Sequence, residues 1–220
     1  MHRPSLVALL ALVLPLAACG SSGTSAQIEE RDGGTHVTWT FDGGASSGLP
    51  ADLEDASGRW SLARDEHAPS GATVLRQLDP GDAAAFNVLL TSASAQDLDL
   101  SVALRADAGA IDQGGGLVWR ARDGSNYYVV RWNPLEDNFR LYTVVGGRRT
   151  QVAHADVTVD PKAWHTVRVA MRGERIECWL DGRLLLEKSD PTFTAAGRVG
   201  LWTKADARTS FDDLRLGPAR

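Results

Sequence analysis

The sequence predicts an all-β domain, built as a two-sheet antiparallel jelly-roll sandwich of about 12–14 strands. From His36 onward, short alternating or wholly apolar runs are interrupted about every eight to twelve residues by Gly, Asp, Pro or Asn. No segment of helical periodicity longer than about one turn occurs in this part of the chain. The 220 residues, 43% hydrophobic and 23% charged, have an ordinary globular composition that suits one domain.

Residues 1–18 are expected to be a lipoprotein signal peptide that is removed from the mature protein. They contain Arg3, an unbroken apolar run over residues 6–14 and the ending Leu-Ala-Ala before Cys19. The run is too short for a helix that spans a membrane. The ending resembles a bacterial lipobox, which implies that Cys19 is diacylated on its sulfur and becomes the new N-terminus. An ordinary secretory signal is the alternative.

Residues 19–36 are expected to form the lipidated N-terminus and a flexible tether, and residues 37–220 the jelly-roll domain. Small and charged residues follow one another after Cys19 without an apolar period, as in flexible linkers. The lipid bilayer is therefore an expected partner, through the acyl anchor. The expected location is the extracytoplasmic side of a bacterial cell envelope, at the outer membrane, its periplasmic face or the cell surface.

The charge of the chain argues against nucleic acid as a partner. Removing residues 1–18 takes away one positive charge and no negative one, so the formal charge moves from −5 to −6. A surface with this sign repels the phosphate backbone.

The clearest strands are expected over residues 97–106, 116–121, 126–132, 138–145, 164–172, 175–181, 183–188, 198–204 and 209–216. Three dipeptides between them, Asp123-Gly124, Gly146-Gly147 and Asp181-Gly182, are expected to adopt the positive φ angles of tight hairpins.

Side chains of a strand alternate between its two faces, which allows the core to be predicted. The core face is expected to carry Leu98, Leu100, Val102 and Leu104 from one strand and Tyr128, Val130 and Trp132 from another. On the second strand and its neighbour, Arg120, Val129 and Arg131 are expected to face a groove.

Cys178 is expected to be a buried thiol. It alternates with Ile176 and Leu180 in "IECWL", so all three side chains share one strand face. Lipid is expected to occupy Cys19, the other cysteine of the chain, so the core has to hold without an internal disulfide.

Several segments carry a resemblance to a known family. They are "GGGLVWRARDGSNYYVVRWN", "LEDNFRLYTVVGGRR", "WHTVRV", "WLDGRLLLEKSDPTF" and "GRVGLWTKADARTSFDDLRL". Over roughly residues 37–217, the chain resembles the concanavalin A-like, laminin-G-like jelly-roll domains of secreted bacterial proteins, and more narrowly relatives of the 3-keto-disaccharide hydrolase domain. The resemblance implies two curved antiparallel sheets, with any carbohydrate lying across the concave one.

One strand departs from the hydrolase-like pattern. That pattern has an arginine, matched here by Arg120, followed by a strand reading Tyr-Glu-x-Gln. In this chain Val129 stands at the glutamate position and Arg131 at the glutamine position. The loss of the carboxylate argues against inherited hydrolase chemistry.

A polar and aromatic set is the candidate glycan-binding site. Sugars bind through aromatic faces that cover the apolar side of the ring and through planar polar groups that bind hydroxyls in pairs. The candidates are Arg120, Asn126, Tyr127, Arg131, Trp179, Lys204 and Asp206. The alternative is a salt-bridge network that stabilises long curved strands.

Cleavage of a glycosidic bond would need two carboxyl groups about 5–9.5 Å apart. Asp97 and Asp99 fit this range, because residues two apart on one strand face have Cα atoms about 6.7 Å apart. Glu136 lies in the loop after an arginine-bearing strand, and Glu177 shares a face with Trp179. The alternative is an ordinary solvated sheet face.

No cofactor is expected to be required, but a structural calcium ion is a candidate. Asp42 in "FDGG" and Asp213 in "FDDL" could meet where the two ends of the domain come together, and calcium prefers oxygen ligands. The family resemblance is compatible with such an ion, since structural calcium near the terminal strands is common in related jelly rolls. The alternative is that both aspartates cap turns.

These observations favour a membrane-anchored envelope lipoprotein whose domain binds glycan without catalysis. The first alternative is a glycoside hydrolase or lyase acting on disaccharides or polysaccharides. The second is a protein-interaction module of the cell envelope.

Overall fold

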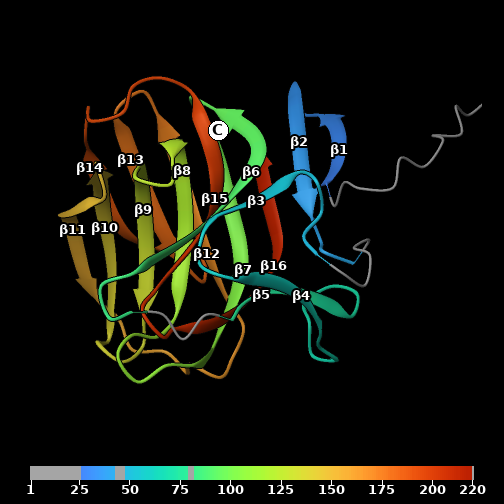
Figure 1. Ribbon diagram of the computed structural model, residues 1–220. Coiled ribbons are helices and arrows are strands. Elements are labelled where there is room, and N and C mark those ends of the chain that lie inside the picture. Colours follow the sequence, from blue (N-terminus) through green and yellow to red (C-terminus); the bar gives the residue numbers. More distant parts are fainter. Residues whose placement is uncertain (1–25, 43–47, 79–81, 220) are drawn as a thin grey trace, which may run out of the picture.

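The computed structural model describes residues 26–42, 48–78 and 82–219 and confirms the all-β sandwich (Figure 1). Within these ranges, sixteen strands form one nine-stranded and one seven-stranded sheet, and all their pairings are antiparallel. The described part of the chain contains no helix with the length and apolar character needed to cross a membrane.

The nine-stranded sheet runs in the order β1 (Ala26–Arg31), β2 (Gly34–Trp39), β16 (Arg208–Gly217), β7 (Leu98–Ala108), β12 (His165–Arg172), β13 (Arg175–Leu180), β14 (Arg183–Ser189). Outside this path, β5 (Thr73–Gln77) pairs with β16 and with β4 (Trp60–Arg64).

The seven-stranded sheet runs in the order β11 (Arg148–Asp156), β10 (Asn138–Val145), β9 (Asn126–Asn133), β8 (Gly115–Asp123), β15 (Gly197–Lys204), β6 (Phe86–Ala95), β3 (Leu53–Ser57). All nine of the clearest strands predicted from the sequence lie on the two paths, and each agrees with its predicted position within two residues at each end.

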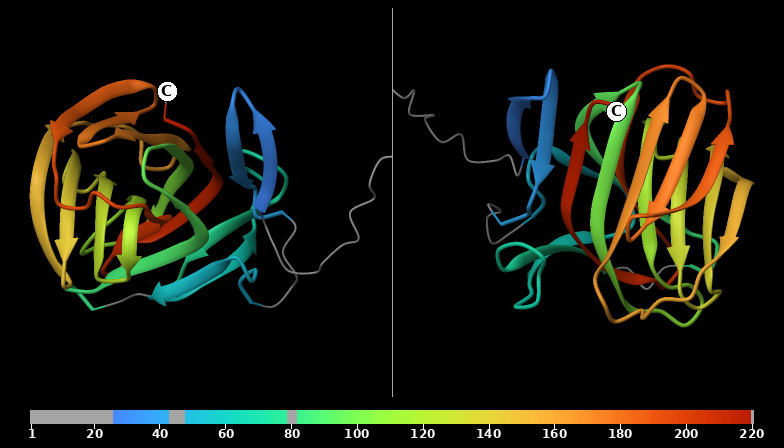
Figure 2. Two further views of the ribbon diagram at one scale, coloured as in Figure 1. Left: turned by 90° about the horizontal axis from the view of Figure 1, so that it is seen from above. Right: turned by 180° about the vertical axis from the view of Figure 1, so that it is seen from behind.

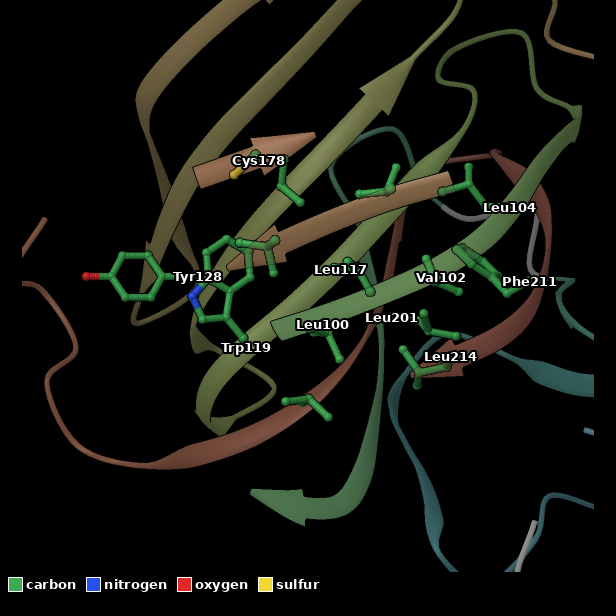
Figure 3. Packing of buried hydrophobic residues seen from close by; sticks show 14 of the residues in the cluster. Leu100, Val102, Leu104, Leu117, Trp119, Tyr128, Cys178, Leu201, Phe211 and Leu214 are labelled. Atoms are coloured by element: carbon green, nitrogen blue, oxygen red, sulfur yellow. The ribbon is translucent and has the colours of Figure 1, made fainter. Parts of the chain in front are cut away.

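The main core lies between the two sheets (Figure 3). The four predicted residues of β7, Leu98 to Leu104 in alternation, are fully buried, which confirms the period of two. Across from them, Leu117 and Trp119 of β8 point inward, and Trp119 stacks on Tyr128 with ring centroids 5.5 Å apart. Burying one such large apolar side chain contributes about 1.5–3 kcal/mol.

The sheet begins earlier than predicted, within the segment expected to be a tether. Ala26–Arg31 and Gly34–Trp39 pair as a hairpin, and β2 continues the pairing onto β16. Asp32 and Gly33 form the turn with φ angles of 50° and 78°, the mirror-image geometry that matches strand twist. Five of the six side chains of β1 are exposed and only Ala26 is half-buried, so this strand has no apolar alternation by which the sequence could reveal it.

Two of the three predicted tight turns have the expected backbone. Gly146-Gly147 and Asp181-Gly182 have positive φ at both positions. The third is different, because neither Asp123 nor Gly124 has positive φ. There the carboxylate of Asp123 accepts the backbone N–H of Ser125 at 2.7 Å, and this bond stabilises the turn without unusual backbone angles.

Cys178 is fully buried among core side chains, as predicted. Burial raises the pKa of its thiol far above the ordinary value, so the thiolate does not form.

The seven-stranded sheet is strongly curved (Figure 2). Arg149 of β11 lies over the ring of Phe86 of β6 at 5.4 Å, although β6 is five strands away in the sheet order. The concave face is packed with a second apolar cluster, made of Val88, Leu90, Val118, Ala121, Tyr127, Val129, Tyr142, Val144 and Trp202. The concave face is therefore lined by buried apolar side chains, and polar groups have to enter at its margins.

Candidate functional site

Six charged side chains gather on the concave face of the seven-stranded sheet. We call them the concave-face cluster: Asp112, Arg131, Glu136, Arg140, Arg149 and Lys204. The pairing of the strands explains why these side chains gather. Arg131 of β9 lies opposite Arg140 of β10 on one side and Gly116 of β8 on the other. Gly116 lies opposite Trp202 of β15, and Lys204 follows two residues later on the same face of that strand. A Cβ atom at Gly116 would overlap the Val130 carbonyl oxygen, so this position has to be glycine.

Asp112 is brought to the cluster by the loop that joins β7 to β8. The carboxylate of Asp206 accepts the backbone N–H groups of Ala110, Ile111 and Asp112 at 2.8, 3.0 and 2.9 Å. Burial would raise the pKa of Asp206, but these three N–H groups lower it below its ordinary value. Asp206 was predicted to contact the glycan, but in the structure its carboxylate holds the β7–β8 loop in place and so positions Asp112.

The carboxylate of Asp112 is buried and bound on all sides. It accepts hydrogen bonds from Arg131 Nη1 at 3.2 Å, Lys204 Nζ at 3.2 Å and Asn133 Nδ2 at 3.0 Å. Its side chain is only 2% exposed. Two predicted residues, Arg131 and Lys204, therefore meet through an aspartate that the sequence did not reveal.

Glu136 is the more accessible carboxylate, with 42% of its side chain exposed. Its Oε2 accepts hydrogen bonds from Arg131 Nη2 at 3.0 Å and Arg140 Nη1 at 2.9 Å, and from the amide of Asn138 at 2.9 Å. Burial by itself would raise the pKa of Glu136, but the amide bond and the two guanidinium charges hold it below the ordinary value. Glu136 is therefore ionised at neutral pH.

Four buried polar atoms on this face have no hydrogen-bond partner among the described residues. They are Arg131 Nε, Asn138 Oδ1, Tyr142 Oη and Arg149 Nη1. The Tyr142 hydroxyl lies near Arg140, but without normal hydrogen-bond geometry. Buried polar atoms are rarely left unpaired in native proteins, so this face is prepared for water or for a polar ligand.

The prediction that Arg120 faces the groove is wrong. Arg120 has a φ of 46° at an irregularity of β8, which breaks the alternation and turns its side chain out of the concave face. The guanidinium donates to the carbonyl oxygens of Gln96, Phe193 and Gly173 at 2.7, 2.6 and 2.7 Å. It therefore joins three loops at one end of the sandwich and is 1% exposed.

Val129 and Tyr127 do face the concave side, but both are fully buried in the second apolar cluster. The hydroxyl of Tyr127 accepts the indole N–H of Trp202 at 3.1 Å, and burial raises the pKa of Tyr127 well above its ordinary value. Asn126 lies at the β8–β9 turn, where its amide donates to Asp123 and its carbonyl oxygen accepts the N–H of Gly146. Neither Tyr127 nor Asn126 presents a free group to a ligand.

Trp179, Asp99 and Glu177 lie on the nine-stranded sheet, and Asp97 lies in the turn between β6 and β7. The guanidinium of Arg168 covers the ring of Trp179 at 4.2 Å and also pairs with Asp99. Glu177 pairs with Arg175 at 2.7 Å.

Asp97 accepts the N–H of Gly173 at 2.9 Å and a bond from Arg120 at 3.3 Å. Asp97, Asp99 and Glu177 therefore lie outside the concave-face cluster that contains Glu136, and each is paired with an arginine.

The two aspartates of the predicted calcium site have different partners. Asp42 accepts the backbone N–H groups of Ala72 and Thr73, whereas Asp213 pairs with Arg215 at 3.1 Å. Among the residues with a described position, no three potential ligands from His, Cys, Asp and Glu come together. The calcium site stays a prediction, and so does lipidation of Cys19, which lies outside the described residues.

Sequence reasoning missed Asp112, Arg140, Tyr142 and Arg149. The sequence of β10 did contain a signal for Arg140 and Tyr142. Together with Asn138 they occupy alternate positions of the strand, so all three side chains point to the same face of the sheet. No such signal existed for Asp112, which depends on contact with a residue 94 positions away.

Comparison with known proteins supports the architecture. A carbohydrate-binding module from Bacillus subtilis, CBM66, is similar with a TM-score of 0.63 and 21% sequence identity, covering 74% of this chain and 94% of that one. A GH43 protein from Bacillus licheniformis has a TM-score of 0.53 and 14% identity, covering 77% of this chain and 39% of that one. A Bacillus subtilis protein of unknown function with a galectin-like fold has a TM-score of 0.51 and 10% identity, covering 73% and 90%. At these identities the likeness concerns the fold alone.

No curated protein sequence matches the chain. A family model does match, over residues 32–217, and it describes a 3-keto-alpha-glucoside-1,2-lyase-like domain. The match covers every strand from β2 to β16 and the whole concave-face cluster. The chain therefore belongs to the family of 3-keto-alpha-glucoside-1,2-lyase-like domains.

Proposed function

We propose that this protein is a lipid-anchored component of a bacterial cell envelope whose jelly-roll domain binds carbohydrate without cleaving it. The observation that carries the proposal is the concave-face cluster beside a layer of aromatic rings. Planar guanidinium and carboxylate groups bind vicinal hydroxyls in pairs, and the aromatic rings of Tyr142 and Trp202 lie next to them. Similarity in fold to a carbohydrate-binding module supports the proposal.

The state of the carboxylates favours binding over glycosidic hydrolysis. Hydrolysis requires one carboxyl group that stays protonated as the acid beside another that is ionised. Glu136 has a lowered pKa, and Asp112 is bound by two cations and an amide. The carboxyl with a raised pKa among the described residues is Asp212, which lies on β16 of the other sheet.

Glycan-array and calorimetric binding to the purified domain test the proposal. Glu136→Gln removes the charge that orders two arginines, and we expect it to weaken glycan binding about tenfold or more. The matched control is Glu187→Gln, since Glu187 is an exposed carboxylate on β14 that also pairs with an arginine. Equal affinity of the two variants would refute the site, and absence of binding to any glycan would refute the function.

A second candidate is a lyase, favoured by the family to which the chain belongs. The ionised Glu136 could take the C2 proton of a 3-keto-glucoside while the C1–oxygen bond breaks, the electron pair leaving with the aglycone, which then gains a proton. The nearby arginines would stabilise the enolate that develops at the ketone. Formation of an enone absorbance and free aglycone, abolished in Glu136→Gln, would replace the binding proposal.

The anchor has an independent test. Metabolic labelling with palmitate should mark the full-length protein and should be lost in Cys19→Ser. Label that persists in this variant would remove the anchor from the proposal without affecting glycan binding.

A further inference from the structure

The carboxylates of the concave-face cluster are already occupied by three of its four cations. Asp112 is bound by Arg131 and Lys204, and Glu136 is bound by Arg131 and Arg140. The fourth cation is Arg149, and no carboxylate of the described residues lies within ion-pair distance of it. The cluster therefore carries two more positive than negative charges, in a chain whose formal net charge is −5.

Arg149 is surrounded by aromatic rings in place of a counter-ion. Its guanidinium carbon lies 4.3 Å from the ring centroid of Tyr142, 5.4 Å from that of Phe86 and 5.8 Å from that of Trp202. Ring faces attract a cation but accept no strong hydrogen bond from its fork of donors. Nη1 is buried and makes no hydrogen bond with the described residues.

This environment disfavours the isolated cation. Burial lowers the pKa of Arg149, and the positive charge of Arg131 nearby acts in the same direction. Interactions with Tyr142, Asp112 and Glu136 oppose this shift but do not cancel it. An anion placed against the guanidinium would offset both effects. A carboxylate matches the planar fork with two parallel hydrogen bonds, which a neutral hydroxyl cannot do.

We propose that the concave-face cluster selects acidic glycans and that Arg149 binds the carboxylate of a uronic acid unit. The inference rests on the proposed carbohydrate-binding function and names its ligand class. The hydroxyl of Tyr142, which has no hydrogen bond of normal geometry, is a second donor beside the same guanidinium. Glu136 and Arg140 at the exposed margin bind the neighbouring hydroxyls.

The test compares each acidic polysaccharide with its own neutral derivative. Polygalacturonate, alginate and hyaluronan are titrated into the full domain beside the same polymers after reduction of their carboxyl groups to alcohols. Dextran, laminarin and levan serve as neutral glycans. We expect at least one acidic polymer to bind about tenfold or more tightly than its reduced form, the difference that one charge-assisted pair supplies. Raising the salt concentration should weaken only the acidic interaction.

Arg149→Gln should remove the preference, so that acidic and reduced polymers bind within about twofold of each other. Arg149→Lys keeps the positive charge but lacks the planar pair of guanidinium N–H donors, so it should retain salt-dependent binding with reduced affinity. The matched control is Arg148→Gln, because Arg148 is exposed at the adjacent position of β11, where side chains point to the opposite face. This control should behave as the unchanged protein. Thermal unfolding shows whether each variant is folded.

The outcomes separate this inference from the function on which it rests. Binding to neutral glycans alone, or equal binding to acidic and reduced forms, overturns the acidic preference and leaves carbohydrate binding in place. A preference that survives in folded Arg149→Gln overturns the role of Arg149. If no polysaccharide of either kind binds, the proposed function itself fails.

Discussion

Asp212 offers a quantitative test of the electrostatics of this fold. Its carboxyl is fully buried on β16, and its oxygens accept the backbone N–H groups of Ser70 and Asp213 at 2.9 and 2.7 Å. No arginine or lysine of the described residues pairs with it. Desolvation therefore dominates and raises the pKa of Asp212 to about 6.

The sign follows from comparing the two states. The unfolded chain ionises at about 3.8 and the folded protein at about 6, so the folded protein holds its proton more tightly. Below about pH 3 Asp212 is neutral in both states and brings no penalty. Above about pH 7 it is charged in both, and the folded protein bears the full cost of the buried charge. A difference of about two pH units at 1.4 kcal/mol per unit corresponds to about 3 kcal/mol of stability lost between pH 3 and pH 7.

Asp212→Asn should be free of this loss. We expect its free energy of unfolding, relative to the unchanged protein, to rise by about 3 kcal/mol between pH 3 and pH 7 in urea titrations. Any constant offset from the amide cancels in this comparison. The control of opposite sign is Asp65→Asn. Burial alone would raise the pKa of Asp65, but hydrogen bonds and the charges of Arg105 and Arg76 lower it, so this variant should lose stability relative to the unchanged protein as the pH rises. Parallel curves for Asp212→Asn and the unchanged protein would refute the reasoning.

Three further predictions concern the loops, the core and the metal. Arg120→Met leaves three carbonyl oxygens without a donor and should lower the free energy of unfolding by about 3–5 kcal/mol. The glycan affinity of the folded variant should be unchanged, and a weaker affinity would show that Arg120 belongs to the binding site. Cys178 should react with Ellman's reagent only in denaturant, and fast labelling of the folded protein would contradict its burial. EDTA should leave the unfolding temperature unchanged, because Asp42 and Asp213 already have protein partners, and a fall reversed by calcium would instead establish the predicted site.

The parts of the fold that sequence could reveal are those governed by alternation. Leu98 to Leu104 in β7 alternate with polar residues, and their faces were predictable because one side of the strand is core and the other solvent. β1 escaped prediction because, apart from Ala26, its side chains are exposed on both faces. Arg120 was misplaced because a single irregularity in β8 reverses the face of the residue, and period-two reasoning assumes that none occurs.

The candidate site was only half predictable for a related reason. Arg131 and Lys204 could be placed on the concave face from strand parity. Their common partner Asp112 lies in a loop whose position depends on Asp206, a contact between segments far apart in the sequence. Arg149 reaches Phe86 only because the sheet is curved, and curvature accumulates over many strands rather than being encoded in one segment.

The early start of β1 has a consequence for where the domain can work. Only six residues lie between Cys19 and Ala26, so the two Cα atoms can be at most about 25 Å apart. A tether running to residue 36 would have spanned about 60 Å. If Cys19 carries the anchor, the domain is restricted to the first few nanometres above the bilayer. Its ligands would then be sugars displayed close to that membrane, and polymers in more distant layers of the envelope would be out of reach.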